Sequence, residues 1–190
     1  LPLGAWLATE QFRGKRALII TINTLMGVPT VIIGVLVYLV LSRSGPLGEL
    51  GWLFTVKGMV VAQFLLTTPL VAALSRQVLE DAWQIHRETF LSLRFTRFGY
   101  IKWLLWDCRF SLTIAILAGL ARAISEVGAV MIVGGNILNS TRTMTTAIAL
   151  ETSKGDLPFA LALGIVLLAI VLLANLLTFA VRSIAERRYG

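Results

Sequence analysis

The segment FALALGIVLLAIVLLANLLTFAV, residues 159–181, decides the fold class of this chain. It contains no charged side chain, and Asn175 and Thr178 are its only strongly polar residues. About 20 mostly apolar residues are enough for an α-helix to cross the hydrocarbon core of a bilayer. The segment therefore predicts a transmembrane helix, and the pattern recurs along the chain.

The composition of the whole chain agrees with a membrane protein. Of its 190 residues, 57% are hydrophobic and 14% are charged, and the mean hydropathy is +0.83. Soluble domains usually carry about 25% charged residues, and a soluble fold could not cover this much apolar surface with polar side chains. The net charge of +7 would suggest nucleic acid in a soluble protein. Here it is interpreted as the positive charge that gathers on the cytoplasmic side of membrane proteins, with lipid and not nucleic acid as the partner.

Apolar segments separated by turn signals predict four complete spans, at about residues 17–41, 55–74, 110–133 and 159–181. Residues 143–152 are too short to span, so they predict a short or re-entrant helix. The apolar opening LPLGAWLA predicts the end of an earlier, truncated helix. The expected fold class is all-α, a polytopic transmembrane helical bundle that forms one domain over residues 1–190.

The distribution of Lys and Arg gives this bundle an orientation. If the segment around Arg13, Lys15 and Arg16 is cytoplasmic, four spans place residues 75–109 and the C-terminal tail on the same side. That side then holds twelve of the seventeen Lys and Arg residues. Because such a bias sets membrane orientation, we expect a multi-pass protein of the plasma or inner membrane with a cytoplasmic C-terminus.

Residues that would support an enzyme or a metal site are scarce. Cys108 and His86 are the only residues of their kinds, which argues against a thiol metal site and most zinc or Ser-His arrangements. The chain has no phosphate loop of the form GxxxxGK[ST], no HExxH and no GxSxG. We therefore expect no cofactor, no metal, no intramembrane catalysis and no ATP hydrolysis by this chain itself.

The charged segment 75–109 is too long and too patterned for a simple connection. Leu91, Phe95 and Phe98 are spaced i, i+4 and i+7, which predicts one face of a helix, with charged residues interleaved. Two interpretations stay open on this spacing. One is a short amphipathic helix that lies on the membrane or docks in a partner's groove; the other is a solvated loop flanked by basic anchors.

Residues 88–110, ETFLSLRFTRFGYIKWLLWDCRF, resemble the EAA loop of ABC importer permeases. In this alignment Glu88 takes the Glu position, Thr89 and Phe90 take the two Ala positions, and Arg94 takes the Gly position. The resemblance implies a coupling helix that sits in a cleft of a cytoplasmic ATPase subunit. The residues implied in ATPase coupling are Arg87, Glu88, Leu91, Arg94, Phe95 and Phe98.

A longer resemblance covers ARAISEVGAVMIVGGNI (residues 121–137) and TRTMTTAIALETSKGDLPFALALGIVLL (residues 141–168). These segments are similar to the tungstate branch of the molybdate, tungstate and sulfate ABC permeases, and Asp107 with Arg109 fits the acidic and basic pair of that branch. The resemblance implies a type I importer permease for tungstate first and molybdate next. It also implies a separate ATPase, an extracytoplasmic substrate-binding protein and a homodimer. The alternatives are another anion such as sulfate, or a channel or secondary transporter, against which the coupling segment argues.

Charged and hydroxyl side chains of the third span and the segment after it are candidates for the translocation path. Arg122 and Glu126 are four residues apart, which predicts a shared helix face, and each charge placed mid-bilayer costs about 2.5–3.5 kcal/mol. They either border the path or form a structural ion pair, the second being favoured for Glu126 because a carboxylate repels an oxyanion. Threonine hydroxyls offer weak donors to an anion in transit, or ordinary capping. The expected path or gate residues are Arg122, Ser125, Glu126, Gly128, Thr145 and Thr146.

Overall fold

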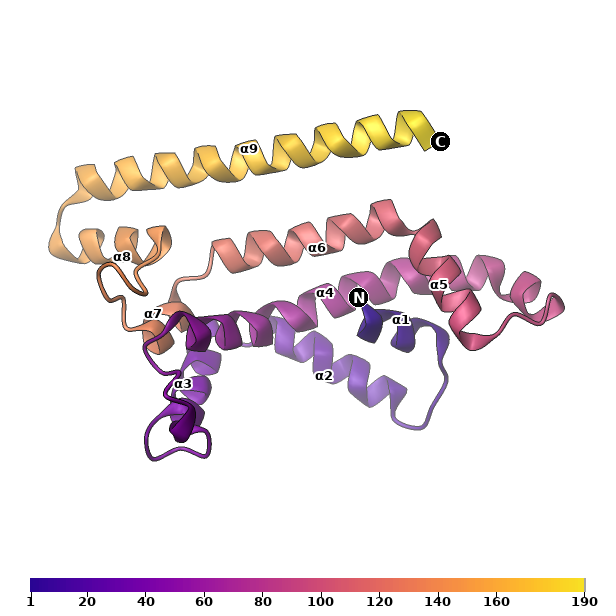
Figure 1. Cartoon of the computed structure of the whole chain (residues 1–190), viewed down its shortest axis with the longest axis horizontal. Helices are drawn as coiled ribbons and strands as arrows, with labels where there is room; N and C mark the ends of the chain where they lie inside the picture. Colours follow the sequence, from indigo (N-terminus) through magenta and orange to yellow (C-terminus); the bar gives the residue numbers. More distant parts are fainter. Residues whose placement is uncertain (190) are drawn as a thin grey trace. The chain divides into compact units, whose positions relative to one another are not determined.

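The computed structural model describes the backbone of residues 1–189 and the side chains of residues 1–176 and 179. All regular elements within residues 1–189 are helices, which confirms the all-α prediction (Figure 1). In chain order they are α1 (Pro2–Thr9), α2 (Lys15–Gly27), α3 (Thr30–Leu41), the 3-10 turn η1 (Gly48–Leu50), α4 (Val56–Ser92), α5 (Arg97–Asp107), α6 (Arg109–Ile124), α7 (Gly128–Gly134), α8 (Met144–Lys154) and α9 (Leu157–Tyr189).

The helices form two compact units, each with its own packing. The first unit comprises Leu1–Pro29 and Phe64–Ala123, and the second comprises Thr30–Gln63 and Ile124–Gly190. One boundary coincides with the break between α2 and α3, another with the end of α6, and the third lies within α4.

Two helices are long and apolar enough by themselves to cross a membrane, namely α4 and the Leu157–Leu176 part of α9. The pairs α2 with α3 and α5 with α6 also qualify if each interrupted pair is counted as one span, which gives up to four spans in the described chain. The basic residues at 182–188, which contribute to the predicted orientation, have side chains outside the described part of the chain.

The expected span over residues 17–41 is not one continuous helix. Helix α2 ends at Gly27 and α3 begins at Thr30, while Val28 has an extended backbone with φ −67° and ψ 133°. Pro29 explains the break, because it lacks an N–H and its ring disfavours helical backbone at the preceding residue. The first expected span is thus two helices that belong to different units.

The expected boundaries of the second and third spans also differ from the observed helices. Helix α4 includes Pro69 and continues well beyond residue 74, so the charged segment 75–109 begins as a continuation of the same helix, which ends at Ser92. The expected span 110–133 is interrupted at residues 125–127, where α6 has ended and α7 has not begun. A short helix does form after this region, as predicted, and it is α8.

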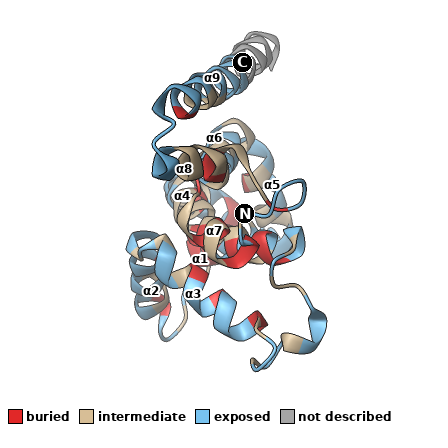
Figure 2. Ribbon diagram, turned by 90° about the vertical axis from the view of Figure 1, so that its left-hand side faces the viewer, coloured by how far each residue is buried: buried red, intermediate tan, exposed pale blue. Residues whose placement is uncertain are grey.

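Each unit has a different kind of core. In the first unit a hydrophobic cluster from α1, α4, α5 and α6 includes Leu79, Phe90, Leu104 and Leu112, all at most 5% exposed. Helix α1 of the same unit also carries several buried residues. In the second unit α3 packs on α7, and most residues of α7 are buried (Figure 2). Helix α9 is exposed along most of its described length (Figure 2). Its apolar surface therefore suits lipid or another protein chain.

Candidate functional site

The turn between α4 and α5, residues 93–96, carries the proposed coupling residues in the first unit. Helix α4 ends in a Schellman motif, in which the Phe95 N–H donates to the Phe90 carbonyl at 3.0 Å and the Arg94 N–H donates to the Leu91 carbonyl at 3.2 Å. Thr96 then caps α5, because its hydroxyl accepts from the Gly99 N–H at 3.3 Å. The two helix ends thus define a tight, hydrogen-bonded turn.

This turn corrects the prediction that Leu91, Phe95 and Phe98 share one helix face. Leu91 lies in the last turn of α4, Phe95 lies between the helices, and Phe98 lies in the first turn of α5. The chain reverses between them because Arg94 adopts a left-handed backbone with φ 50°. The i, i+4, i+7 spacing therefore does not correspond to a continuous helix.

Apolar side chains are nevertheless concentrated on the outside of the turn. Leu91, Leu93 and Phe98 are 63%, 65% and 85% exposed. Arg87, Glu88 and Arg94 are also exposed, while Phe95 is 42% exposed. The turn thus presents apolar surface flanked by charges of both signs, which is typical of a protein-docking surface.

The buried ring of Phe90 packs against the turn. It is 5% exposed, and its ring lies 5.4 Å from the ring of Phe95, 5.2 Å from that of Trp103 and 5.9 Å from that of Trp83, measured between centroids. A contact between Phe90 and Phe95 is the hydrophobic contact that commonly accompanies a Schellman motif. The alignment gave Phe90 only an Ala position, so its structural role was not predicted, and neither was the exposure of Leu93.

The start of α5 is also tied to the end of α1. The Arg97 Nε lies 3.0 Å from the Glu10 Oε1, and the Tyr100 hydroxyl donates to the same oxygen at 3.2 Å. Burial, and then the charge of Glu10, raise the pKa of the Tyr100 hydroxyl in the segment expected to lie outside the membrane, so it stays protonated as a donor at neutral pH. These contacts join the start of α5 to the end of α1.

Replacing Arg94 by glycine is expected to stabilise the protein. The left-handed conformation costs a side-chain-bearing residue about 1–2 kcal/mol, and glycine avoids this cost but loses about 0.5–1 kcal/mol of conformational entropy. The net gain in the free energy of unfolding should be about 0.5–1 kcal/mol, visible as a higher Tm of the purified protein in detergent.

Arg87→Gly is the matched control for Arg94→Gly. Arg87 is exposed and lies within α4, where glycine should cost about 1 kcal/mol. Opposite signs for the two variants support the assignment of the turn. A Tm lowered by both would show that Arg94 does not occupy a position that favours glycine.

Glu126, in the second unit, is placed by α7 and α8. Its carboxylate Oε1 accepts from the Ala129 N–H at 3.1 Å, and its carbonyl accepts from the Thr145 hydroxyl at 3.0 Å. Glu126 is 6% exposed. A carboxylate is favoured at this position because the first N–H groups of a helix lack partners within the helix and carry partial positive charge. Glu126 thus joins the start of α7 to the start of α8.

Arg122 and Glu126 do not share a helix face as predicted. Arg122 is exposed in the last turn of α6, whereas Glu126 lies beyond the end of that helix. Ser125 is exposed in the same break. Gly128 opens α7 beside Thr30 and Val31 of α3, and a Cβ on it would lie 3.0 Å from a Val31 methyl. Of the predicted path residues, the structure therefore brings together Glu126, Gly128, Thr145 and Thr146.

The threonine hydroxyls at the start of α8 have partners within the chain. Thr143 and Thr146 form a reciprocal capping box, and the hydroxyls of Thr143 and Thr145 lie 2.9 Å apart. Thr145 and Thr146 are 8% and 0% exposed. In this arrangement they cap and pack α8, and their contact with a transported anion stays a prediction.

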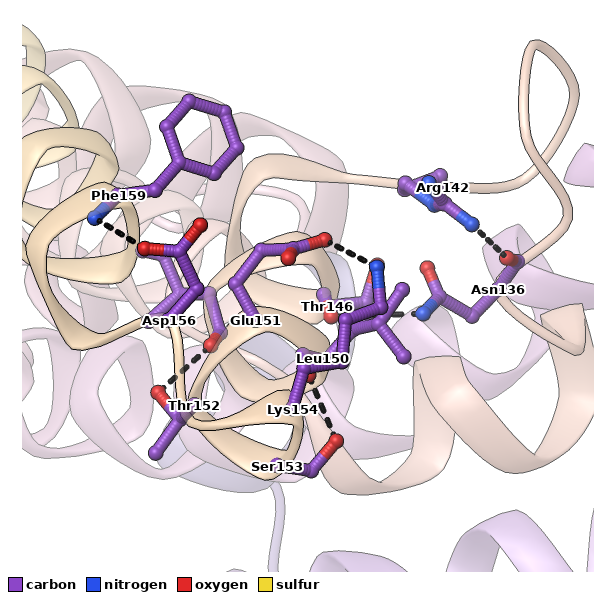
Figure 3. Close-up of polar contacts among 11 residues, drawn as sticks. Asn136, Arg142, Thr146, Leu150, Glu151, Thr152, Ser153, Lys154, Asp156 and Phe159 are labelled. Carbon is purple, nitrogen blue, oxygen red and sulfur yellow. Dashed lines mark hydrogen bonds and ion pairs between the residues drawn. The ribbon is translucent and has the colours of Figure 1, made fainter.

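The connection between α7 and α8 is held by polar contacts that the sequence did not predict. The Arg142 Nη2 donates to the Asn136 carbonyl at 3.4 Å, and the Asn136 amide donates to the Thr146 carbonyl at 3.5 Å (Figure 3). The buried Thr141 hydroxyl donates to the Gly134 carbonyl and accepts from the Ile137 N–H at 2.9 Å. These contacts fix the segment that follows α7.

No group of three or more potential metal ligands occurs among the residues that the structure describes. The candidate functional surfaces are the turn between α4 and α5 in the first unit and, separately, the polar junction of α7 and α8 in the second.

Comparison with known proteins identifies relatives over most of the chain, although no protein-family model matches it. A tungstate uptake system permease protein of Campylobacter jejuni is 38% identical over 168 residues, which cover 88% of this chain and 70% of that protein. A protein of Haloferax volcanii named "Probable anion ABC transporter permease protein" is 39% identical, with 100% of this chain and 84% of that protein covered. A tungstate uptake system permease protein of Peptoclostridium acidaminophilum is 39% identical, with 96% and 80% covered.

Proposed function

The chain belongs to the permease family of ABC transporters, and from this membership we propose that it is the membrane-spanning subunit of an oxyanion importer. Tungstate is the proposed substrate and molybdate the next candidate, because two relatives are named for tungstate uptake and a third for an anion. The chain is accordingly a multi-pass protein of the cell membrane and a permease subunit that is not itself catalytic.

The proposed motor is a separate cytoplasmic ATPase that docks on the α4–α5 turn. The observation that carries this assignment is the exposure of Leu91, Leu93 and Phe98 at a turn that is closed by backbone hydrogen bonds and packed on Phe90. Apolar side chains on a preorganised surface bind with a smaller entropy cost than those on a mobile loop. ATP-driven closure of two ATPase subunits would then move the turn and alternate access to the two sides of the membrane.

The proposed topology follows the predicted charge distribution. Residues 75–109 and the C-terminus face the cytoplasm, and residues 1–190 act as one permease domain. Two copies pair in the membrane, and an extracytoplasmic binding protein delivers the anion. The exposed apolar surface of α9 supports contact with lipid or with the second copy.

The proposed translocation path or gate passes the junction of α7 and α8. The residues concerned are Arg122, Ser125, Glu126, Gly128, Thr145 and Thr146. Burial of Glu126 with its carboxylate on α7 supports a structural role in the gate rather than contact with the anion. Arg122 has the charge to attract an oxyanion, and hydroxyl groups supply weak donors that allow release.

Uptake measurements test the substrate assignment. Cells with and without the permease would be supplied with labelled tungstate, molybdate or sulfate at equal concentration. We expect loss of the permease to abolish high-affinity tungstate uptake, to reduce molybdate uptake less, and to leave sulfate uptake unchanged. An equal loss of sulfate uptake would contradict tungstate as the substrate.

A further inference from the structure

A groove of about 440 Å³ opens in the first unit at the start of α2. Its polar lining includes Gln11, Lys15, Arg16 and Glu80, and its apolar lining includes Phe12 and Ile19. None of these residues belongs to the α4–α5 turn or to the junction of α7 and α8. The groove therefore shares no lining residue with the surfaces to which coupling and translocation are assigned.

The Lys15 ammonium group lacks a hydrogen-bond acceptor among the described residues beside this groove. The residue is 8% exposed, and its buried Nζ has no hydrogen-bond acceptor in the structure. Lys15 Nζ forms a long ion pair with the Glu80 Oε1 at 3.9 Å, which is beyond hydrogen-bond distance, and the other oxygen of Glu80 is paired with Arg76 on the same helix. A buried ammonium group carries three donors and is costly to leave unsatisfied.

The helix end beside Lys15 adds positive potential. Helix α2 begins after Gly14, which has a left-handed backbone with φ 95°, and no side chain caps the helix. Its first turn contains no acidic residue. The free N–H groups and the dipole of such a helix end attract anions, and the Arg16 side chain lies along the same groove.

Charge and shape together indicate the chemical class of the ligand. Glu80, the one carboxylate in the lining, is shared between Arg76 and Lys15, so the charged side chains of Lys15, Arg16 and Glu80 together give the lining a net positive charge. Phe12 and Ile19 provide an apolar wall beside them, and Phe12 is fixed by stacking on Trp6 at 4.5 Å between ring centroids. A basic recess with an apolar wall suits a tetrahedral oxyanion group at the membrane surface.

We propose that this groove binds a tetrahedral oxyanion group through Lys15 and the start of α2. The group is either the phosphate of an anionic phospholipid or a free oxyanion such as phosphate or tungstate. Both sources offer oxygen acceptors to Lys15 Nζ. They differ at the apolar wall of Phe12 and Ile19, because only a phospholipid has acyl chains that could cover it.

The test uses the purified permease–ATPase complex and the substitution Lys15→Gln. Phosphatidylglycerol and phosphatidylcholine would be added to detergent-solubilised protein, and retained lipid counted by native mass spectrometry. Inorganic phosphate and tungstate would be tested by the shift in Tm. We expect Lys15→Gln to weaken binding of one of these probes at least about tenfold, as expected for loss of a charge-assisted contact.

Two further variants keep the result interpretable. Arg13→Gln removes the same charge from an exposed residue of the same connection outside the groove, and it should leave binding unchanged. Lys15→Arg keeps the charge and should retain binding, which excludes misfolding as the cause of a loss. Selective loss of phosphatidylglycerol identifies a lipid, and selective loss of the phosphate or tungstate effect identifies a free anion. Binding that is absent, or that Arg13→Gln weakens equally, would overturn the proposal.

Discussion

Replacing Phe98 by serine is expected to weaken capture of the cytoplasmic ATPase by at least about 30-fold. Phe98 is 85% exposed in the first turn of α5, so the substitution removes apolar surface without opening a cavity in the chain. Aromatic residues buried at the centre of an interface typically contribute 2 kcal/mol or more, which corresponds to about 30-fold in Kd. The measurement is the affinity of purified permease for purified ATPase, with thermal unfolding to verify that the permease remains folded.

Ile85→Ser is the matched control for Phe98→Ser. Ile85 is 75% exposed on α4, so the same kind of apolar surface is lost about two helical turns before the end of the helix. We expect its ATPase affinity to be unchanged, and we expect Glu88→Arg to lower the affinity by reversing a charge beside the turn. If ATPase binding survives both Phe98→Ser and Glu88→Arg, the assignment of the coupling turn is wrong.

Gly34→Val is expected to be the most destabilising single substitution of those considered. A Cβ on Gly34 would lie 2.7 Å from the Cα of Ala129 and 3.3 Å from the Cδ1 of Ile132. Overpacking usually costs about 1–3 kcal/mol, and the upper part of this range applies because the obstacle is backbone, which cannot rotate away. Helix α3 would then have to separate from α7, so we expect a markedly lower Tm and poor recovery of folded protein.

Gly27→Val provides the comparison for Gly34→Val. Gly27 ends α2 in the same predicted span, and a Cβ there would meet no atom within 4 Å. The expected change in the free energy of unfolding is about 0.5 kcal/mol or less, typical of a surface substitution. Equal destabilisation by the two variants would show that the close approach of α3 and α7 is not what requires glycine at residue 34.

Local features of this chain could be predicted from its sequence because they depend on neighbouring residues. The apolar length of residues 159–181 predicted the last long helix, and the short helix α8 was predicted from residues 143–152. The alignment of Arg94 with a glycine position agrees with the left-handed backbone found there. The break at Pro29 could also have been predicted from the steric effect of proline on Val28, but the apolar continuity of the segment outweighed it.

Contacts between distant residues could not be predicted in the same way. Glu10 meets Arg97 and Tyr100 across the fold of the first unit, and no periodicity relates residues so far apart. Phe90 appeared to be one apolar residue among several, and only the positions of the surrounding rings show that it supports the turn. The i, i+4 spacing of Arg122 and Glu126 was misleading because α6 ends between them.

Reconstituted transport tests the central claim most directly. The permease with its ATPase would be reconstituted into proteoliposomes, and the binding protein would be added on the opposite side of the membrane from the ATPase. Uptake of labelled tungstate would then be measured with and without ATP on the side of the ATPase. We predict uptake that requires ATP and all three proteins and that is lost with Phe98→Ser but not with Ile85→Ser. Tungstate uptake by the permease alone, without ATPase or ATP, would contradict the account and indicate a channel or secondary transporter.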